Sequence, residues 1–356
     1  MKWLVGYQLT EDDAFMDELL RQRAQVAEVY FSWGTMPNGR HAAAAHANLT
    51  AAEAQRRTEM DLQTLADHGF RFNLLLNGNC YGGRSLSRMF LMEVCDTIEE
   101  IGARFGIASV TTTSPVLAKV VKRNFPDLEV RASVNMEIGS IAGMEYLSDT
   151  FDSFYIAREL NRELDQLRVM RDWCVKNGKK SYILANSGCL RHCSARQFHD
   201  NLVAHEREIA EMNNGAEFHG ICADYLRGAA DKAVYLRRLS FIRPEDMAQY
   251  DGLADGAKLA TRVSRVPAQI LRAYAQGHYA GNLLDLLEPD HAATLYPDVI
   301  ENNRLPADFG ARTAQCGHRC ETGGECSYCR EAFAAACVRI PDYAVADGGD
   351  SCDHTK

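Results

Sequence analysis

The sequence predicts an α/β protein whose main part is a TIM-like (β/α)8 barrel, followed by a short Cys-rich C-terminal appendage. Apolar, β-branched runs alternate with helical stretches along most of the chain, and about eight such units indicate a closed parallel sheet. No Gly-rich dinucleotide fingerprint follows the first apolar run, which argues against a doubly wound sheet. The 356 residues fit a barrel over 1–310 and a Cys-rich metal-binding tail over 311–356.

The first third of the chain supplies the clearest elements. Residues 85–105 have apolar side chains at three- and four-residue steps and are predicted to form a helix. The same reasoning gives helices and strands on either side of it. We expect strands over 3–9, 28–33 and 70–78 and helices over 12–26 and 51–68.

The rest of the barrel follows the same alternation. Strands are expected over 107–113, 129–136, 153–157 and 180–186, with a helix over 115–124 and another marked by Leu160, Leu164, Leu167, Met170 and Cys174. Residues 240–247 and 256–262 are expected to close the sheet.

The net charge and the hydropathy of the chain limit its possible cellular locations and binding partners. The formal net charge is -9, so an RNA substrate would need a local basic patch. The N-terminal residues show no signal-peptide pattern, and no run approaches 18 apolar residues. We therefore expect a cytoplasmic protein that has no membrane partner.

Cysteines give the strongest chemical signal in the sequence. The chain contains 12 of them, and a reducing compartment argues against a disulfide framework. Scattered buried residues are one interpretation, whereas cysteines grouped at short spacings indicate a metal or a cluster. Cys189 and Cys193 form a C-x3-C pair directly after the strand expected over 180–186, which places them at the barrel mouth. Cys80 and Cys222 also follow strand-like runs, whereas Cys95 and Cys174 fall on apolar helix faces and are interpreted as structural. Four thiolates at one rim are what a 4Fe–4S cluster needs.

A second group of cysteines lies in the appendage. Its members, Cys316, Cys320, Cys326 and Cys329, have the pattern C-x3-C-x5-C-x2-C within fourteen residues. This pattern indicates a metal site, either a structural zinc or a second iron–sulfur cluster, and the alternative is a flexible tail without metal.

Two segments of the chain resemble the peptidase U-32 (collagenase-like) family. Asn186, Gly188, Cys189 and Cys193 nearly match the family's Asn-Arg-Gly-x-Cys-x-x-x-Cys-Arg element, with Arg196 in place of the displaced final Arg. Residues 258–262 resemble its Lys-Ile-Glu-Gly-Arg element, with Lys and Arg present and Glu absent. The resemblance spans about residues 1–290 and implies either a peptidase or an iron–sulfur protein for oxygen-independent hydroxylation of RNA or a ubiquinone precursor.

Three functions therefore remain open. The first is a hydroxylase-like redox enzyme with the cluster on Cys80, Cys189, Cys193 and Cys222, acting on RNA or a small molecule. Arg196, His199, Lys258 and Arg262 are its candidate catalytic or substrate-binding residues, since cations bind carboxylate or phosphate groups. The second is a collagenase-like peptidase, although neither G-x-S-x-G nor H-E-x-x-H is present. The third is a non-enzymatic iron–sulfur subunit that docks a protein partner.

Overall fold

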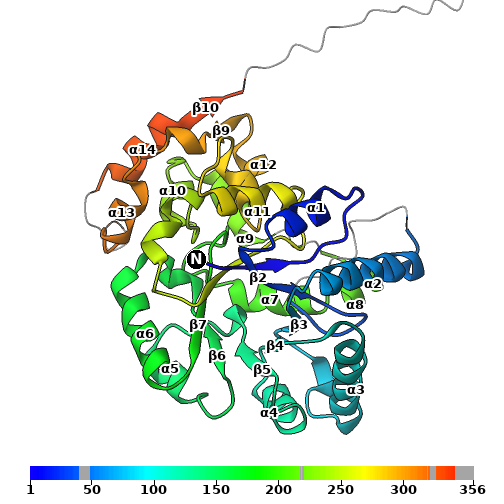
Figure 1. Cartoon of the computed structure of the whole chain (residues 1–356). Helices are drawn as coiled ribbons and strands as arrows, with labels where there is room; N and C mark the ends of the chain where they lie inside the picture. The colour runs from blue at the N-terminus through cyan, green and yellow to red at the C-terminus, as the bar shows by residue number, and fades with distance from the viewer. Residues whose placement is uncertain (40–48, 217, 219, 319, 321–325, 341–356) are drawn as a thin grey trace, which may run out of the picture.

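The fold is a closed barrel of eight parallel strands surrounded by helices. The computed structural model describes residues 1–39, 49–216, 218, 220–318, 320 and 326–340. The strands pair in sequence order, and β1 also pairs with β8, so the sheet has no open edge (Figure 1). Their bounds are β1 Trp3–Gly6, β2 Val26–Phe31, β3 Phe72–Leu76, β4 Ser109–Thr112, β5 Glu129–Ala132, β6 Ser153–Tyr155, β7 Lys180–Leu184 and β8 Gly256–Leu259.

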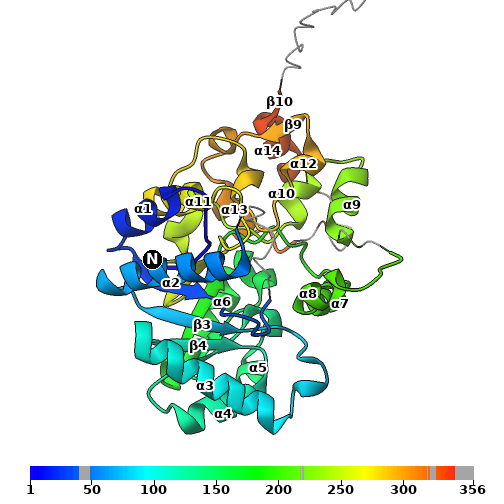
Figure 2. The same cartoon turned by 90° about the vertical axis from the view of Figure 1, so that its right-hand side faces the viewer.

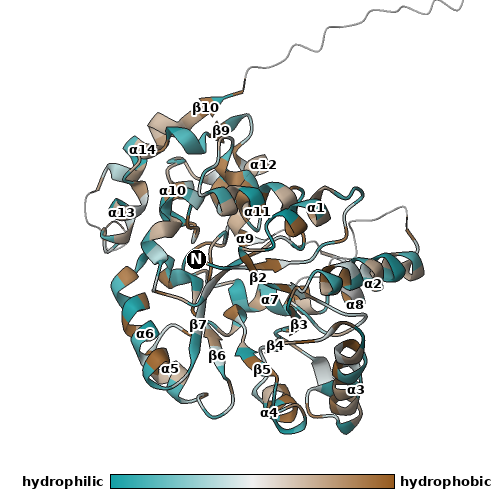
Figure 3. Cartoon of the chain, in the orientation of Figure 1, coloured by the Kyte–Doolittle hydropathy of each residue, from teal (hydrophilic) through white to brown (hydrophobic). Residues whose placement is uncertain are grey.

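Helices follow most strands and cover the outside of the barrel. The α-helices are α1 Ala14–Arg21, α2 Ala51–Asp67, α3 Arg88–Phe105, α4 Pro115–Asn124, α5 Ile141–Glu145, α6 Leu164–Lys176, α7 Arg196–Ala204, α8 Glu206–Ala210, α9 Ile221–Gly228, α10 Val234–Arg238, α11 Pro267–Gln276, α12 Ala292–Leu295, α13 Phe309–Ala314 and α14 Tyr328–Ala336. Figure 3 shows polar and apolar residues on the same outer helices. On α3, Phe90, Val94 and Ile98 are buried, and Ser87 caps the first turn by accepting a hydrogen bond from the Phe90 N–H.

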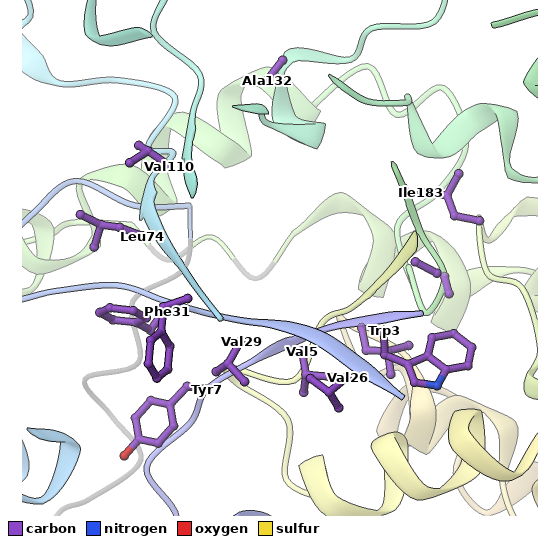
Figure 4. Packing of buried hydrophobic residues seen from close by; sticks show 14 of the residues in the cluster. Trp3, Val5, Tyr7, Val26, Val29, Phe31, Leu74, Val110, Ala132 and Ile183 are labelled. Atoms are coloured by element: carbon purple, nitrogen blue, oxygen red, sulfur yellow. The ribbon is translucent and has the colours of Figure 1, made fainter. Parts of the chain in front are cut away.

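The strands present two different faces. One face packs an apolar layer against the helices, where Val5, Val26 and Val29 lie beside Trp3 (Figure 4). The other face fills the barrel interior with aromatic and aliphatic side chains such as Tyr30, Tyr155 and Tyr182. This alternation is the expected consequence of the two-residue period of a strand.

The barrel interior also contains a buried ion pair. The Arg131 guanidinium donates to the Glu28 carboxylate at 2.8 Å and to the Glu129 carboxylate at the same distance. The side chains of Arg131 and Glu28 are 2 % and 6 % exposed. Interactions with Glu28 raise the pKa of Arg131 against the opposing effect of burial, so this guanidinium stays charged.

The prediction for the last third of the barrel was partly wrong. Residues 256–259 form β8 as expected, but 240–247 contribute no strand, and Pro244–Tyr250 form a 3-10 helix instead. The buried side chains of Phe241 and Ile242 explain the strand-like pattern. The Ile242 N–H bonds to the Ala185 carbonyl just beyond β7, so the segment runs along the loops and not within the sheet.

The expected strand end at Cys222 was also wrong, since this residue lies in α9. Gly220 has a φ of +87°, a conformation that suits glycine and ends the preceding segment, and α9 begins at Ile221. The helix expected over 12–26 is shorter and ends at Arg21, because Val26 already belongs to β2.

Residues beyond the barrel add a second apolar cluster. It combines Leu236 and Leu284 with Leu305, Phe309 and Ala332, so residues on both sides of position 310 share it. β9 (Asp298–Ile300) and β10 (Cys337–Arg339) form a small antiparallel sheet in this part of the molecule (Figure 1). Residues 321–325 and 341–356 of the predicted appendage lie outside the described residues. No helix in the described part of the chain is long and apolar enough to cross a membrane.

Candidate functional site

Polar side chains gather where the barrel strands end. They line a cavity of about 50 Å³, and they come from the ends of β3, β5, β6 and β8 and from the segment at position 288. Its polar lining includes Asn77, Asn135, Arg158, Lys258, Arg262 and Glu288. The C-terminal ends of barrel strands are where enzymes of this fold place their active sites. Three cations facing one carboxylate make this cavity suited to an anionic group.

Lys258 lies within this cavity, as the sequence predicted. Its Nζ atom is 4.2 Å from the centre of the Tyr30 ring, and the residue is 7 % exposed. Burial lowers the pKa of Lys258 to about 7, and the positive charges of Arg262 and Arg158 act in the same direction. This amine can therefore gain or lose a proton near neutral pH.

Arg262 is the second predicted residue at the mouth. It lies just beyond β8, is 6 % exposed, and donates from Nη1 to Oδ1 of Asn38 at 3.2 Å. A Cβ atom at Gly6 would lie 2.7 Å from its side chain, so the first strand needs glycine where it passes this arginine. Arg262 is thus held in a fixed position at the edge of the cavity.

Arg158, which the sequence reasoning missed, links this cavity to the first cysteine. Its Nη1 atom lies 3.0 Å from Sγ of Cys189, and Nη2 donates to Oδ1 of Asn135 at 3.1 Å. The Arg158 Nε is buried without a hydrogen-bond partner among the described residues. A buried guanidinium that contacts a thiol is placed to stabilise negative charge on that sulfur.

The loop that carries Cys189 is fixed by its backbone. The Gly188 N–H donates to the Glu288 carbonyl at 2.8 Å, and a ring nitrogen of His291 bonds to the Gly188 carbonyl at the same distance. The Ser240 N–H donates to the Cys189 carbonyl at 3.1 Å. These contacts hold the thiol at the rim in one orientation.

Arg196 and His199 occupy α7, the helix after the C-x3-C pair. Arg196 is 6 % exposed and forms ion pairs with Glu137, at 2.9 Å, and with Glu159. Burial works against its charge, but Cys189 and Glu159 raise the pKa of Arg196 overall. The His199 ring packs edge-on against Phe218 with centroids 5.7 Å apart. The structure thus gives Arg196 contacts that position the cysteine loop, and a direct catalytic role for either residue stays a prediction.

Three of the four predicted cluster ligands interact electrostatically. Burial raises the pKa of Cys222 to about 11, and the nearby thiols of Cys189 and Cys193 contribute to that rise. Cys222 reaches them from α9, and the other two come from the loop between β7 and α7. A C-x3-C pair and a thiol remote in sequence therefore lie within electrostatic range of each other.

Cys80, the fourth predicted ligand, has a different partner. A hydrogen bond with His205 lowers the pKa of Cys80, and the Gly82 N–H donates to its sulfur at 3.4 Å. His205 Nδ1 lies 2.8 Å from a Glu208 carboxylate oxygen, and interactions with Cys80 and Glu208 raise the pKa of His205. The three side chains line a cavity of about 250 Å³ beside α7 and α8, which lie next to each other in Figure 2. Sequence reasoning missed this trio, because Cys80 is remote along the chain from the His205 and Glu208 pair.

Among the described residues, the thiols are not drawn together into a coordination shell. Within this part of the chain, no group of three or more His, Cys, Asp or Glu side chains is close enough to hold a metal ion. All eleven described cysteines are free thiols, so none is tied up in a disulfide. The donors are soft sulfur atoms, which fits an iron–sulfur cluster in chemistry, and the cofactor itself stays a prediction.

The cysteines of the appendage line a cavity of their own. Cys316, Cys320, Cys326 and Cys329 all border a space of about 280 Å³ between the end of α13 and the start of α14. Burial raises the pKa of Cys329 to about 11, and the other three thiols are near enough to add to it. The predicted grouping of these four residues is therefore visible in the fold, and their metal is still a prediction.

Comparisons with known proteins agree with this architecture. No family profile matches the chain. The uncharacterized protease MJ1657 of Methanocaldococcus jannaschii is 26% identical over 275 residues, which cover 74% of this chain and 76% of that protein. Among solved structures, the U32 peptidase Mk0906 superposes with a TM-score of 0.51 at 13% identity, covering 72% of this chain and 91% of the other. This structural likeness supports the barrel fold.

Proposed function

We propose that this chain is a member of the peptidase U-32 family and an iron–sulfur redox enzyme with its cluster at the barrel mouth. One observation carries the proposal: Cys222, on α9, lies near enough to Cys189 and Cys193, in the loop between β7 and α7, for their thiols to raise its pKa. Three soft donors at the functional end of a barrel are more than structural packing requires.

The proposed ligand set is that of the sequence prediction. Cys189, Cys193 and Cys222 would hold the cluster, and Cys80 would complete the set when it leaves His205. A bound cluster supplies one-electron transfer. Arg158, which already contacts the Cys189 sulfur, would offset the negative charge of the thiolates.

The adjoining cavity defines the substrate class. Lys258, Arg158 and Arg262 offer charge-assisted hydrogen bonds to a carboxylate or phosphate. The three cations that line this space suit one anionic group. We therefore favour a small anionic substrate, or one exposed group of a larger one, for an oxygen-independent hydroxylation.

The test is an anaerobic purification followed by iron, sulfide and absorbance measurements. Wild-type protein is expected to be brown and to contain about four iron and four sulfide per cluster. The double variant Cys189→Ala/Cys193→Ala should lose both elements. Cys95→Ser is the matched control, since Cys95 lies on α3 away from the rim and should leave the iron content unchanged. A colourless wild-type protein without iron contradicts the proposal.

A second candidate function, a thiol-dependent peptidase, is favoured by the Cys80 trio. Cys80, His205 and Glu208 have the residue types and the order of contacts of a nucleophile, its base and an orienting carboxylate. In such a reaction the Cys80 sulfur bonds to the peptide carbonyl carbon, and His205 passes its proton to the departing amine. Water then hydrolyses the thioester and releases the free enzyme.

The two candidates differ in what Cys80→Ala does. For a peptidase, this variant loses cleavage of labelled gelatin or casein, whereas Cys189→Ala/Cys193→Ala retains it. For the redox enzyme, wild-type protein shows no cleavage, and Cys80→Ala lowers the iron content instead. Iron and peptidase assays on the same three proteins therefore separate the two functions.

A further inference from the structure

The appendage contains a side-chain cluster that the proposed function does not use. Its four cysteines line one cavity with His318 and with the guanidinium groups of Arg162, Arg237 and Arg312. None of the barrel-mouth cysteines borders this space. The cluster is therefore a separate site with its own chemistry.

The first two cysteines lie around a sharp turn at the end of α13. Gly317 and His318 both have left-handed backbone conformations, with φ of +57° and +49°. The turn points the His318 N–H at Sγ of Cys316, 3.4 Å away. A non-glycine residue adopts this conformation only at a cost of about 1 kcal/mol. A backbone N–H directed at sulfur is the arrangement that stabilises a metal-bound thiolate.

The turn is held in place by contacts to the barrel side. The His318 ring contacts Arg191 and forms an ion pair with Glu163 at 3.3 Å when it is protonated. His318 is 8 % exposed, so the turn is packed into the protein. Cys316 is thus presented to the cavity by a rigid segment.

The second pair of cysteines comes from the start of α14. Cys329 is the second residue of this nine-residue helix, and Cys326 precedes it by a C-x2-C spacing. Two close pairs of cysteines, one at the end of a helix and one at the start of the next, therefore face each other across the cavity.

The surroundings provide positive charge for a thiolate-rich centre. Arg162 is 5 % exposed, donates to the Leu236 carbonyl at 2.7 Å and stacks over the Phe241 ring at 4.7 Å. Four thiolates around one divalent ion have a net charge of about −2. Three arginines at the border of the cavity offset this charge and lower the free-energy cost of burying such a centre.

We propose that Cys316, Cys320, Cys326 and Cys329 bind a single structural zinc ion. Two close cysteine pairs separated by five residues in the sequence are typical of zinc sites with four cysteine ligands, in which each Zn–S distance is about 2.3 Å. The ion draws the four sulfurs together from their positions around the cavity. It thereby ties α13 to α14, whose residues Phe309 and Ala332 belong to the apolar cluster beside the barrel.

The first test is the zinc content of the full-length protein and its variants. Wild type is expected to contain one zinc per chain, and Cys316→Ser/Cys329→Ser none. The matched control is Cys337→Ser, because Cys337 lies in β10 of the same region but does not border the cavity. The iron content should be the same in all three proteins, so this result is independent of the barrel-mouth cluster. Unchanged zinc in the double variant overturns the proposal.

A second measurement avoids variants that fold poorly. Wild-type protein produced with cobalt in place of zinc should show the intense thiolate-to-metal absorption and the strong visible bands of a tetrahedral site with four thiolate ligands. Chelation should release the metal and make residues 316–329 more susceptible to proteolysis. If Cys316→Ser/Cys329→Ser loses iron and sulfide that Cys189→Ala/Cys193→Ala retains, the appendage binds a second iron–sulfur cluster instead of zinc.

Discussion

Gly188 lies so close to Pro289 that a Cβ atom on Gly188 would collide with the Pro289 carbonyl oxygen. The obstacle is backbone, which cannot rotate away as a side chain would. Gly188 immediately precedes Cys189, so glycine at position 188 allows the loop to adopt the backbone path that places the Cys189 thiol at the barrel mouth.

Gly188→Ala is accordingly expected to displace the Cys189 loop. Overpacking of this kind costs about 1 to 3 kcal/mol, and the shift moves Cys189 away from Arg158. We expect most of the iron to be lost after anaerobic purification, with a modest fall in unfolding free energy. Gly102→Ala is the control, since nothing lies within 4 Å of a Cβ there. Full iron retention in Gly188→Ala would show that the loop does not position a ligand.

Much of the barrel could be predicted because its local signals agree with its tertiary structure. The runs that became β3 and β7 are apolar and lie between amphipathic helices, and the face of α3 through Val94, Ile98 and Ile101 is buried as expected. Residues 240–247 misled the prediction because Phe241 and Ile242 are buried as they would be in a strand. Periodicity reports burial, and burial does not require a place in the sheet.

Residues of the candidate site could be predicted only where they lie in or beside a segment that is recognisable in the sequence as a strand. The C-x3-C pair and Lys258 stand next to strands, so their place at the mouth followed from the fold. The contact between Cys80 and His205 joins a loop after β3 to the junction of α7 and α8, and no local pattern encodes it. Arg158 was missed for the same reason, since its chemistry comes from touching Cys189 across the rim.

The buried pair of Arg131 and Glu28 gives a stability prediction that is independent of function. Glu28→Gln removes one of the two carboxylates that compensate the Arg131 guanidinium, which is 2 % exposed, and Glu129 remains, so we expect a loss of up to about 3 kcal/mol in unfolding free energy. Urea denaturation followed by circular dichroism measures it. Asp165→Asn is the control, because its pair with Arg168 is exposed on both sides and should change stability by less than about 1 kcal/mol. Equal effects of the two substitutions would contradict a role for burial.

The Cys80 and His205 contact predicts a reactive thiol. The hydrogen bond from His205 lowers the pKa of Cys80, whereas burial raises the pKa of Cys174 to about 11. Iodoacetamide at neutral pH should therefore modify Cys80 in metal-free protein much faster than Cys174, as followed by peptide mass spectrometry. His205→Ala should slow the labelling of Cys80, because loss of the hydrogen bond raises the pKa of the thiol and lowers its thiolate fraction.

The matched control for this labelling experiment is His278→Ala. His278 is an exposed histidine that also faces a carboxylate, that of Glu245 at 3.4 Å, but it lies away from Cys80. Its replacement should leave the labelling rate of Cys80 unchanged. If His205→Ala labels as fast as wild type, the thiol is not activated by the imidazole and the peptidase candidate loses its basis.

Lys258 predicts how stability depends on pH. Burial lowers the pKa of Lys258 to about 7 in the folded protein, whereas in the unfolded chain an amine titrates near about 10.4. Between these values the unfolded state binds the extra proton, so the stability of the wild type rises with pH across this window. Below pH 7 Lys258 is protonated in the folded protein as well, so the free energy of unfolding is lowered by the full cost of burying an ammonium group.

Replacing this lysine by methionine should remove that cost. Lys258→Met is expected to stabilise the protein by a few kcal/mol near pH 6, and the gain should shrink as the pH rises towards 10, where the amine begins to lose its proton in the unfolded chain as well. Urea unfolding at several pH values measures the difference. Lys176→Met, on the exposed side of α6, serves as the control and should show no such trend.

The same Lys258→Met protein should also bind phosphate or a small carboxylate more weakly than wild type below pH 7, because the ammonium group lines the cavity proposed for the anion. A stabilisation that is constant from pH 6 to pH 10 would show that the folded and unfolded chains hold this proton equally, and Lys258 would then not be the group that titrates near neutral pH at the barrel mouth.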